Sequence, residues 1–529
     1  MHRLSMFGLA ASLAVLGTGG CNSFLTSDTA KADPNNPNRA TADQVFVAVQ
    51  AGQSAQQEGI VALIACMWMQ QCTGTSNFLQ VLEQYGIASE DTPSPAFSSV
   101  YEGGGLVDIR QIEAAETAAG DNQYLGIAQV WEAIDMAVAA DIWGDVPYRE
   151  AVGTEATPRL DPQAQVYADL QALLTSAITH LGGAGPGPGT LDLVYGGNTT
   201  KWIAAANTLK ARLYMHTVEQ DNNQIDNAAL GNAITYALLG ISAPANDVKA
   251  KHTSQPGEDN MWYQFNFRSG FGQFVVAGRA LADLLLARND TARLHQYFGL
   301  SARPWQPKHT YTLRQVVLDA NNNAQQATDS GSSANVPPVW VTTVGDTTTD
   351  STVKWKNVGL PYGGQDPLGG RSAAGVSLLE GTRNSPTFSQ PIVTYIENEL
   401  ILAEAYYRLG QTANAQTHFD NARASVTGLG AKTITSINDI MEEKYVAMYQ
   451  NIEVWNDYKR SCYPAITPVA NSAFGNKVPG RLFYGTSEAN ANPTNVPERS
   501  VQLQTGGNVV STPPTSPGFR NPNDPNVCP

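Results

Sequence analysis

The 529-residue sequence has little charge and few of the residue patterns found in catalytic centres. Charged residues make up only 15% of the chain, and the net charge of −15 argues against nucleic acid as a partner. The seven histidines are scattered without ligand-like spacing. No His-Glu-x-x-His, Gly-x-Ser-x-Gly or lysine-containing phosphate loop occurs. These absences argue against the enzyme classes that such motifs mark.

Two further patterns look like catalytic signatures but lack the necessary chemistry. The glycine-rich stretch 182–189 has no Lys-Ser/Thr pair, and its prolines remove the backbone donors that a phosphate needs. Glu442 and Glu443 are neighbours, and on a helix neighbouring side chains point about 100° apart. They cannot converge on one glycosidic bond, so we expect them to form a solvated helix face.

Long apolar runs are also missing, except at the amino terminus. His2 and Arg3 precede an apolar run over 4–16, which is too short to span a bilayer and ends in small residues before Cys21. This pattern predicts a lipoprotein signal peptide over 1–20, with Cys21 as the lipidated first residue; a plain secretory signal is the alternative. Residues 21–40 are polar and predict a flexible tether.

Cysteine is rare, and four cysteines remain if Cys21 is lipidated. An even number in an exported chain favours two disulfides, Cys66 with Cys72 and Cys462 with Cys528. The first pair would lie about 9 Å apart on a continuous helix, so the bridge requires the helix to end near Gln71. The second would hold the Pro/Asn-rich tail 506–529 against the body. Four unpaired thiols are the alternative.

The clearest structural signal is a predicted helical hairpin over 391–428. Apolar residues recur every three or four positions from Tyr395 onward, Gly410 is placed to end the first helix, and Thr412 is placed to cap the second. The Ala-x-x-x-Phe pattern that ends at Phe419 is typical of tetratricopeptide hairpins. Because one hairpin cannot bury its own apolar face, we expect others elsewhere.

The remaining periodicity separates a helical scaffold from a loop-rich insertion. Helices are predicted over 41–72, 106–119, 123–142, 161–181, 200–219, 226–239 and 434–459. Between 242 and 390 helical periodicity survives only near 275–297, and short strands are predicted near 339–345 and 353–359. We therefore expect a single domain over 41–505, with scaffold segments 41–241 and 391–465 and an insertion over 242–390.

The insertion also carries the residues that sugar binding requires. Flat aromatic faces contact the C–H groups of sugar rings, and directed polar groups bind hydroxyls. The candidate ligand residues are Asn260, Trp262, Tyr263, Asn266, Arg268, Trp305, Trp340 and Trp355, with Trp68 and Asn77 beside the 66–72 turn. A place in the core is the alternative for each tryptophan. Asp346 and Asp350 are the candidates for a structural calcium; no other cofactor is expected.

Several strings together resemble the SusD/RagB family of outer-membrane glycan-binding lipoproteins. They are Cys21 and the stretches 143–151 (WGDVPYREA), 192–212, 397–410, 443–464 and 480–485, which fall in the order of the family. The resemblance implies a mostly α fold, with tetratricopeptide-like hairpins in a right-handed superhelix and a large irregular loop-rich ligand-binding region.

The same resemblance implies a function and a location. Family members bind oligosaccharides, or sometimes peptides, without cleaving them, and pass them to a TonB-dependent outer-membrane transporter. This protein is then expected on the cell-surface side of the outer membrane, held by its lipid. A tetratricopeptide-type scaffold that binds only proteins is the alternative function.

Overall fold

The computed structural model describes residues 40–76, 78–85, 94–219, 224–268, 274–367, 375–470, 477–498, 502 and 528. The predicted signal peptide, Cys21, nearly all of the tether, Asn77 and most of the tail lie outside these residues. Among the helices of the described part, none is both long and apolar enough to cross a membrane.

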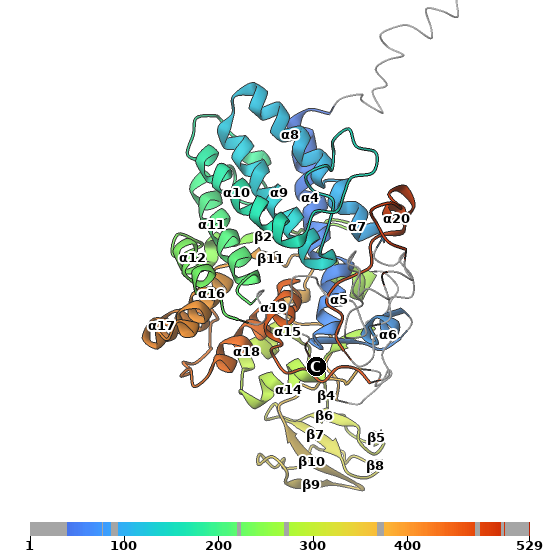
Figure 1. The fold of residues 1–529 in the computed structure, drawn as a ribbon. Coiled ribbons are helices and arrows are strands. Elements are labelled where there is room, and N and C mark those ends of the chain that lie inside the picture. Colours follow the sequence, from blue (N-terminus) through green and yellow to red (C-terminus); the bar gives the residue numbers. More distant parts are fainter. Residues whose placement is uncertain are drawn as a thin grey trace, which may run out of the picture.

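Antiparallel helices stack one against the next to form the scaffold (Figure 1). The helices in chain order are α4 (Ala42–Glu58), α8 (Leu106–Ala119), α9 (Asn122–Trp143), α10 (Gln163–Leu181), α11 (Thr199–His216), α12 (Asn227–Ala237), α16 (Tyr395–Arg408) and α17 (Thr412–Ala424). Each of these packs on its neighbour in this order, so α12 contacts α16 across the whole insertion. The predicted mostly α, tetratricopeptide-like class is confirmed.

Local sequence signals explain where most of these helices begin and end. Thr394 caps α16, because its hydroxyl accepts from the Glu397 N–H (3.1 Å) in a capping box. Gly410 follows α16 with a φ of 74°, a conformation that glycine adopts without strain. The predicted cap of α17 is wrong by one residue, because Gln411 takes the position before the helix and Thr412 is its first residue.

The predicted helix over 434–459 is two helices. They are α18 (Ile437–Ala447) and α19 (Glu453–Ser461). The break contains Gln450, whose φ of 61° is left-handed, and its side chain donates to the Asn384 Oδ1 atom (2.8 Å). Gln450 therefore bonds a residue of the insertion, and its left-handed backbone interrupts the helix.

The insertion is more regular than its composition suggests. A five-stranded sheet runs in the order β4 (Arg303–Pro304), β6 (Val316–Leu318), β7 (Ala324–Ala327), β10 (Val353–Gly359) and β9 (Thr347–Asp350). It lies at the lower end of Figure 1, below α14 (Arg279–Ala287). We call residues 303–359 the strand module. The N–H of Ser301 donates to the Pro361 carbonyl (2.8 Å), so the two ends of the module meet.

One of the two predicted strands is wrong. Residues 353–359 form β10, whereas 339–345 form no strand and the neighbouring β9 begins at Thr347. The Val341 carbonyl instead accepts side-chain hydrogen bonds from Asn357 (3.0 Å) and Gln325 (3.4 Å). Side chains of neighbouring strands therefore bond this backbone, in place of the strand-to-strand hydrogen bonds that a strand over 339–345 would make.

The remaining helices and the paired strands outside the five-stranded sheet are short. The other helical segments are α5 (Ile60–Trp68), α6 (Phe78–Glu83), α7 (Ser94–Tyr101), η1 (Gly189–Leu191), η2 (Pro244–Asn246), α13 (Met261–Tyr263), the π-helical η3 (Gln264–Arg268), α15 (Thr291–Tyr297), η4 (Thr382–Asn384) and α20 (Thr486–Ala491). The paired strands are β1 (Cys72–Gly74) with β3 (Val275–Ala277), β2 (Val248–Ala250) with β11 (Gln390–Val393), and β5 (Thr310–Tyr311) with β8 (Gly331–Ser332).

Both expected cysteine pairs are joined in the structure. Cys66 and Cys72 lie with Cα atoms 5.5 Å apart, and α5 ends before the second of them. Cys462 and Cys528 have a Cα separation of 5.0 Å, which holds residue 528 beside the end of α19.

Candidate functional site

Exposed and half-buried aromatic rings gather where the short segment formed by α13 and η3 meets α6. The rings of Tyr263 and Phe267 lie 5.1 Å apart between centroids, and Phe265 meets Phe78 of α6 edge-on at 6.5 Å. Phe267 is 40% exposed and Phe78 is 36% exposed, whereas Tyr263 and Phe265 are half-buried. We call these four residues the aromatic platform. A π-helical turn such as η3 is rare and often occurs at functional sites.

Asn260 fixes the start of the platform segment. Its Oδ1 atom accepts from the backbone N–H groups of Trp262 (2.9 Å) and Tyr263 (3.2 Å), as a helix cap does. Its Nδ2 atom donates to the Phe388 carbonyl (3.2 Å), and the side chain is fully buried. Asn260 was predicted to contact ligand, but its polar atoms are used to hold the segment.

A buried ion pair joins the same segment to the scaffold. Glu58, the last residue of α4, is 3% exposed, and its Oε1 atom lies 2.7 Å from His252 Nε2. Its Oε2 atom accepts from the Met261 N–H (3.3 Å). Burial raises the pKa of Glu58, and the interactions with His252 offset only part of that rise. The scaffold thus sets the position of the platform.

Arg268 anchors the other end. Its guanidinium pairs with the buried carboxylate of Asp259 and lies over the Tyr263 ring, 5.5 Å from the centroid. The Arg268 side chain is 39% exposed, so part of it is open to solvent. With both ends held, the rings are ordered before any ligand arrives, which lowers the entropic cost of binding.

Two buried side chains of the segment carry unpaired polar atoms. Trp262 and Asn266 are each 2% exposed, and neither the indole N–H nor the Asn266 amide has a hydrogen-bond partner in the described part of the chain. An unpaired buried polar group costs about 1–3 kcal/mol. A water molecule or a ligand hydroxyl that reached these atoms would recover that cost.

The other predicted tryptophans lie in cores. Trp68 is fully buried, donates to the Leu82 carbonyl (2.8 Å) and meets Trp455 edge-on at 4.8 Å. It presents no face to a ligand, because α5 places it between α6 and α19. Asn77 lies outside the described residues. Phe78, the residue after Asn77, is exposed, and sequence reasoning missed it because nothing in its own spacing sets it apart.

Trp340 and Trp355 are buried in the core of the strand module, and the half-buried Trp305 packs against that core. Trp355 is fully buried between Tyr311 (4.8 Å) and Trp340 (6.0 Å). The indoles of Trp305 and Trp355 donate to the same Asp350 oxygen, at 2.8 and 3.1 Å. Asp350 is buried and bonded by these groups, whereas its expected calcium partner Asp346 is exposed.

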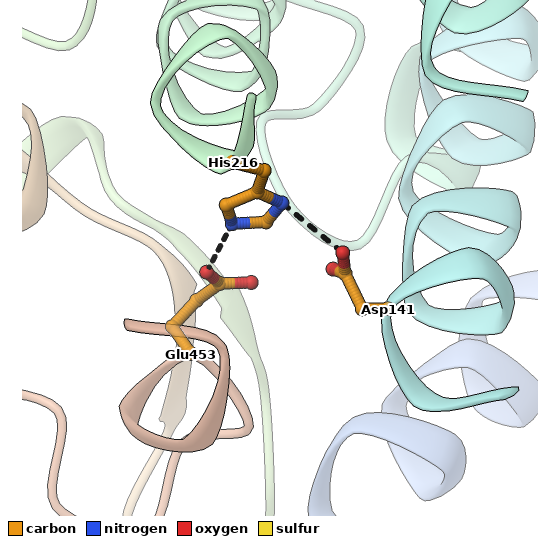
Figure 2. A group of neighbouring side chains, drawn as sticks. All are labelled: Asp141, His216 and Glu453. Atoms are coloured by element: carbon orange, nitrogen blue, oxygen red, sulfur yellow. Dashed lines mark hydrogen bonds and ion pairs between the residues drawn. The ribbon is translucent and has the colours of Figure 1, made fainter. Parts of the chain in front are cut away.

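A buried group of Asp141, His216 and Glu453 has the residue types of a metal or catalytic centre (Figure 2). His216 Nδ1 lies 3.1 Å from Asp141 Oδ1, and Nε2 lies 2.9 Å from Glu453 Oε2. Burial lowers the pKa of His216, but the two carboxylates outweigh it and raise the pKa to about 10. The charged imidazole and its two carboxylates join α9, α11 and α19.

Glu443 is a second buried charge centre, and the expectation that it is solvated is wrong. It is fully buried and pairs with Arg288, Arg293 and Arg423 (2.6 Å for Arg423). Burial raises its pKa, but the three guanidinium groups outweigh burial and lower the pKa to about 2. The neighbouring Glu442 remains partly exposed.

Stacked hairpins that carry an ordered aromatic surface define a helical-repeat protein built for binding. A family model described as "Starch-binding associating with outer membrane" matches residues 34–485. The chain belongs to this SusD-like family of starch-binding proteins associated with the outer membrane. The predicted SusD/RagB membership is thereby confirmed. No curated protein matches the chain.

Solved structures share the fold at low sequence identity. A SusD/RagB family protein from Bacteroides thetaiotaomicron is 20% identical with a TM-score of 0.61, covering 86% of this chain and 95% of the other. A chitin-binding protein is 19% identical (TM-score 0.65; 91% and 100% covered). A chitin-binding SusD homolog from Flavobacterium johnsoniae is 16% identical (TM-score 0.64; 91% and 98% covered).

Proposed function

We propose that this protein is a surface lipoprotein that captures oligosaccharides on the aromatic platform and passes them to a TonB-dependent outer-membrane transporter. The observation that carries the proposal is the aromatic platform, with two exposed and two half-buried rings, on the segment held by Asn260 and Arg268. Membership of a starch-binding family and the fold shared with two chitin-binding proteins support a glycan ligand. The lipid on Cys21 would hold the protein at the membrane.

The aromatic platform suits the binding of a ligand without catalysis. The faces of Phe267 and Phe78 offer apolar contact to the C–H groups of sugar rings, and the guanidinium of Arg268 offers directed donors to hydroxyls. Neither kind of contact forms or breaks a covalent bond. A ligand held in this way can be released intact to a transporter.

The test is calorimetric binding of malto-oligosaccharides, chitin oligosaccharides and short peptides to the protein and to Phe267→Ala. Removing one exposed ring from the contact should weaken the preferred ligand about tenfold, which corresponds to about 1.4 kcal/mol. Leu313→Ala is the matched control, because Leu313 is 55% exposed on the strand module, away from the platform.

The panel also separates the alternatives. A preference for peptides would keep the platform but change the ligand class. Equal binding of every ligand, or unchanged affinity in Phe267→Ala, would contradict capture at the platform and favour a protein-binding scaffold. Co-purification with a transporter fits both functions, so ligand binding is measured on the isolated protein.

A further inference from the structure

A second candidate site lies in a cavity where the insertion meets the last hairpins of the scaffold. The cavity has a volume of about 400 Å³, within the range of small-molecule pockets. Its walls come from β2, α15, η4 and β11, from the start of α16, and from the ends of α17 and α18. None of the four platform residues lines it.

Arg383 is the unusual residue of this cavity. Its side chain lines the wall, yet the residue is only 7% exposed. The guanidinium carbon lies 5.2 Å from the Tyr297 ring centroid and 5.5 Å from those of Phe388 and Tyr449. Its Nε atom is buried without a hydrogen-bond partner, and no carboxylate of the described chain pairs with it. Aromatic faces hold the cation but do not neutralise it.

The other cations of the wall are already paired. Lys249 lies 3.2 Å from Asp247, and Arg293 pairs with Asp290 (3.0 Å) and with Glu443. The uncompensated charge in the wall is therefore that of Arg383. Buried charges are ordinarily paired, so the missing partner is an anion.

We propose that this cavity binds a small ligand through a carboxylate on Arg383. A planar guanidinium pairs with a carboxylate through two parallel N–H donors, and the pair is strong when it is shielded from water. The rings of Tyr297 and Phe388 offer apolar contact to the rest of the ligand. Two polar wall residues, Gln296 and Ser389, offer partners for hydroxyl or amide groups.

The carboxylate has two possible sources, an acidic sugar or the carboxyl end of a peptide. Binding is measured calorimetrically on the full mature protein with glucuronate, galacturonate and diglycine, and with the methyl ester of each. The acid forms should bind and the esters should not. Whichever acid binds identifies the source of the carboxylate.

Arg383→Gln removes the charge and leaves a shorter, neutral polar side chain, so it should weaken binding of the acid at least tenfold. Arg303→Gln is the matched control, since Arg303 is exposed on β4 and outside the cavity. Ser389→Trp is a second variant that keeps Arg383 and fills the cavity, and it should also abolish binding. If Arg383→Gln is too unstable to assay, Ser389→Trp tests the proposal in its place.

Either of two results would overturn the proposal. One is the absence of acid binding by the wild type at concentrations up to about 10 mM, a very weak affinity. The other is equal binding of acid and ester, or equal binding by wild type and Ser389→Trp. The site does not rest on the proposed oligosaccharide capture, because Phe267→Ala should leave acid binding unchanged.

Discussion

Raising the pH should weaken the junction that His216 makes between α9, α11 and α19. The pKa of His216 is about 10 in the folded protein, against 6.5 for an unperturbed side chain. A pKa raised by folding contributes stability that is complete below pH 6.5 and is lost as the pH rises through 10. At about 1.4 kcal/mol per pKa unit, the loss amounts to about 5 kcal/mol of unfolding free energy.

The geometry explains why the contribution is large. The imidazolium is fully buried with a carboxylate at each ring nitrogen, 3.1 Å away at Asp141 and 2.9 Å away at Glu453. Arg212 also lies near Glu453, at 3.5 Å, while its guanidinium pairs with Glu397 at 2.5 Å. Deprotonating His216 leaves one carboxylate charge without its partner in a region that water does not reach.

The assay is urea unfolding between about pH 6 and about pH 10.5, for wild type and His216→Gln. The glutamine can still donate to one carboxylate but carries no charge. The stability difference between the two proteins should therefore shrink by several kcal/mol across this range. His295→Gln serves as the control, because His295 is exposed and should show no such trend. A constant difference between wild type and His216→Gln would show that His216 is neutral in the fold and would refute the reasoning.

Two further predictions concern Glu443 and the amino terminus. Glu443→Gln should lower the free energy of unfolding by about 3 kcal/mol or more, because it removes the one carboxylate that three guanidinium groups share, whereas Glu442→Gln should change it little; equal effects in urea unfolding would contradict this. Cys21→Ser should move the protein from the membrane fraction to the soluble fraction and remove the acyl mass, with Ser23→Ala as control; continued membrane attachment would exclude the lipid anchor.

The sequence predicted the scaffold well because its signals are local. Apolar residues at three- and four-residue steps, a capping threonine and a glycine after the last turn act within one helix, as at Thr394 and Gly410. The break between α18 and α19 was not predicted, because Gln450 makes its hydrogen bond to Asn384, far away in the chain. Contacts of this kind leave no periodic trace.

The candidate site was predicted only in part for the same reason. The sequence singled out the aromatic segment that follows Asn260, in which Arg268 is exposed and Tyr263 is half-buried. Nothing in the sequence distinguishes the tryptophans of the strand module from ligand-binding ones. In the structure, the indoles of Trp305 and Trp355 both donate to Asp350, which lies 45 and 5 residues from them in the chain. Composition shows that an aromatic residue is available, whereas the partner that buries it is set by tertiary contacts.

The hydrogen bond between Ser301 and Pro361, which joins the two ends of the strand module, has a consequence for how this protein can evolve. The strand module has an aromatic core of its own, and its entrance and exit stand side by side. Additions or losses within it need not disturb the register of the hairpins. The strand module can thus gain, lose or exchange residues during evolution while the stacked helices stay unchanged.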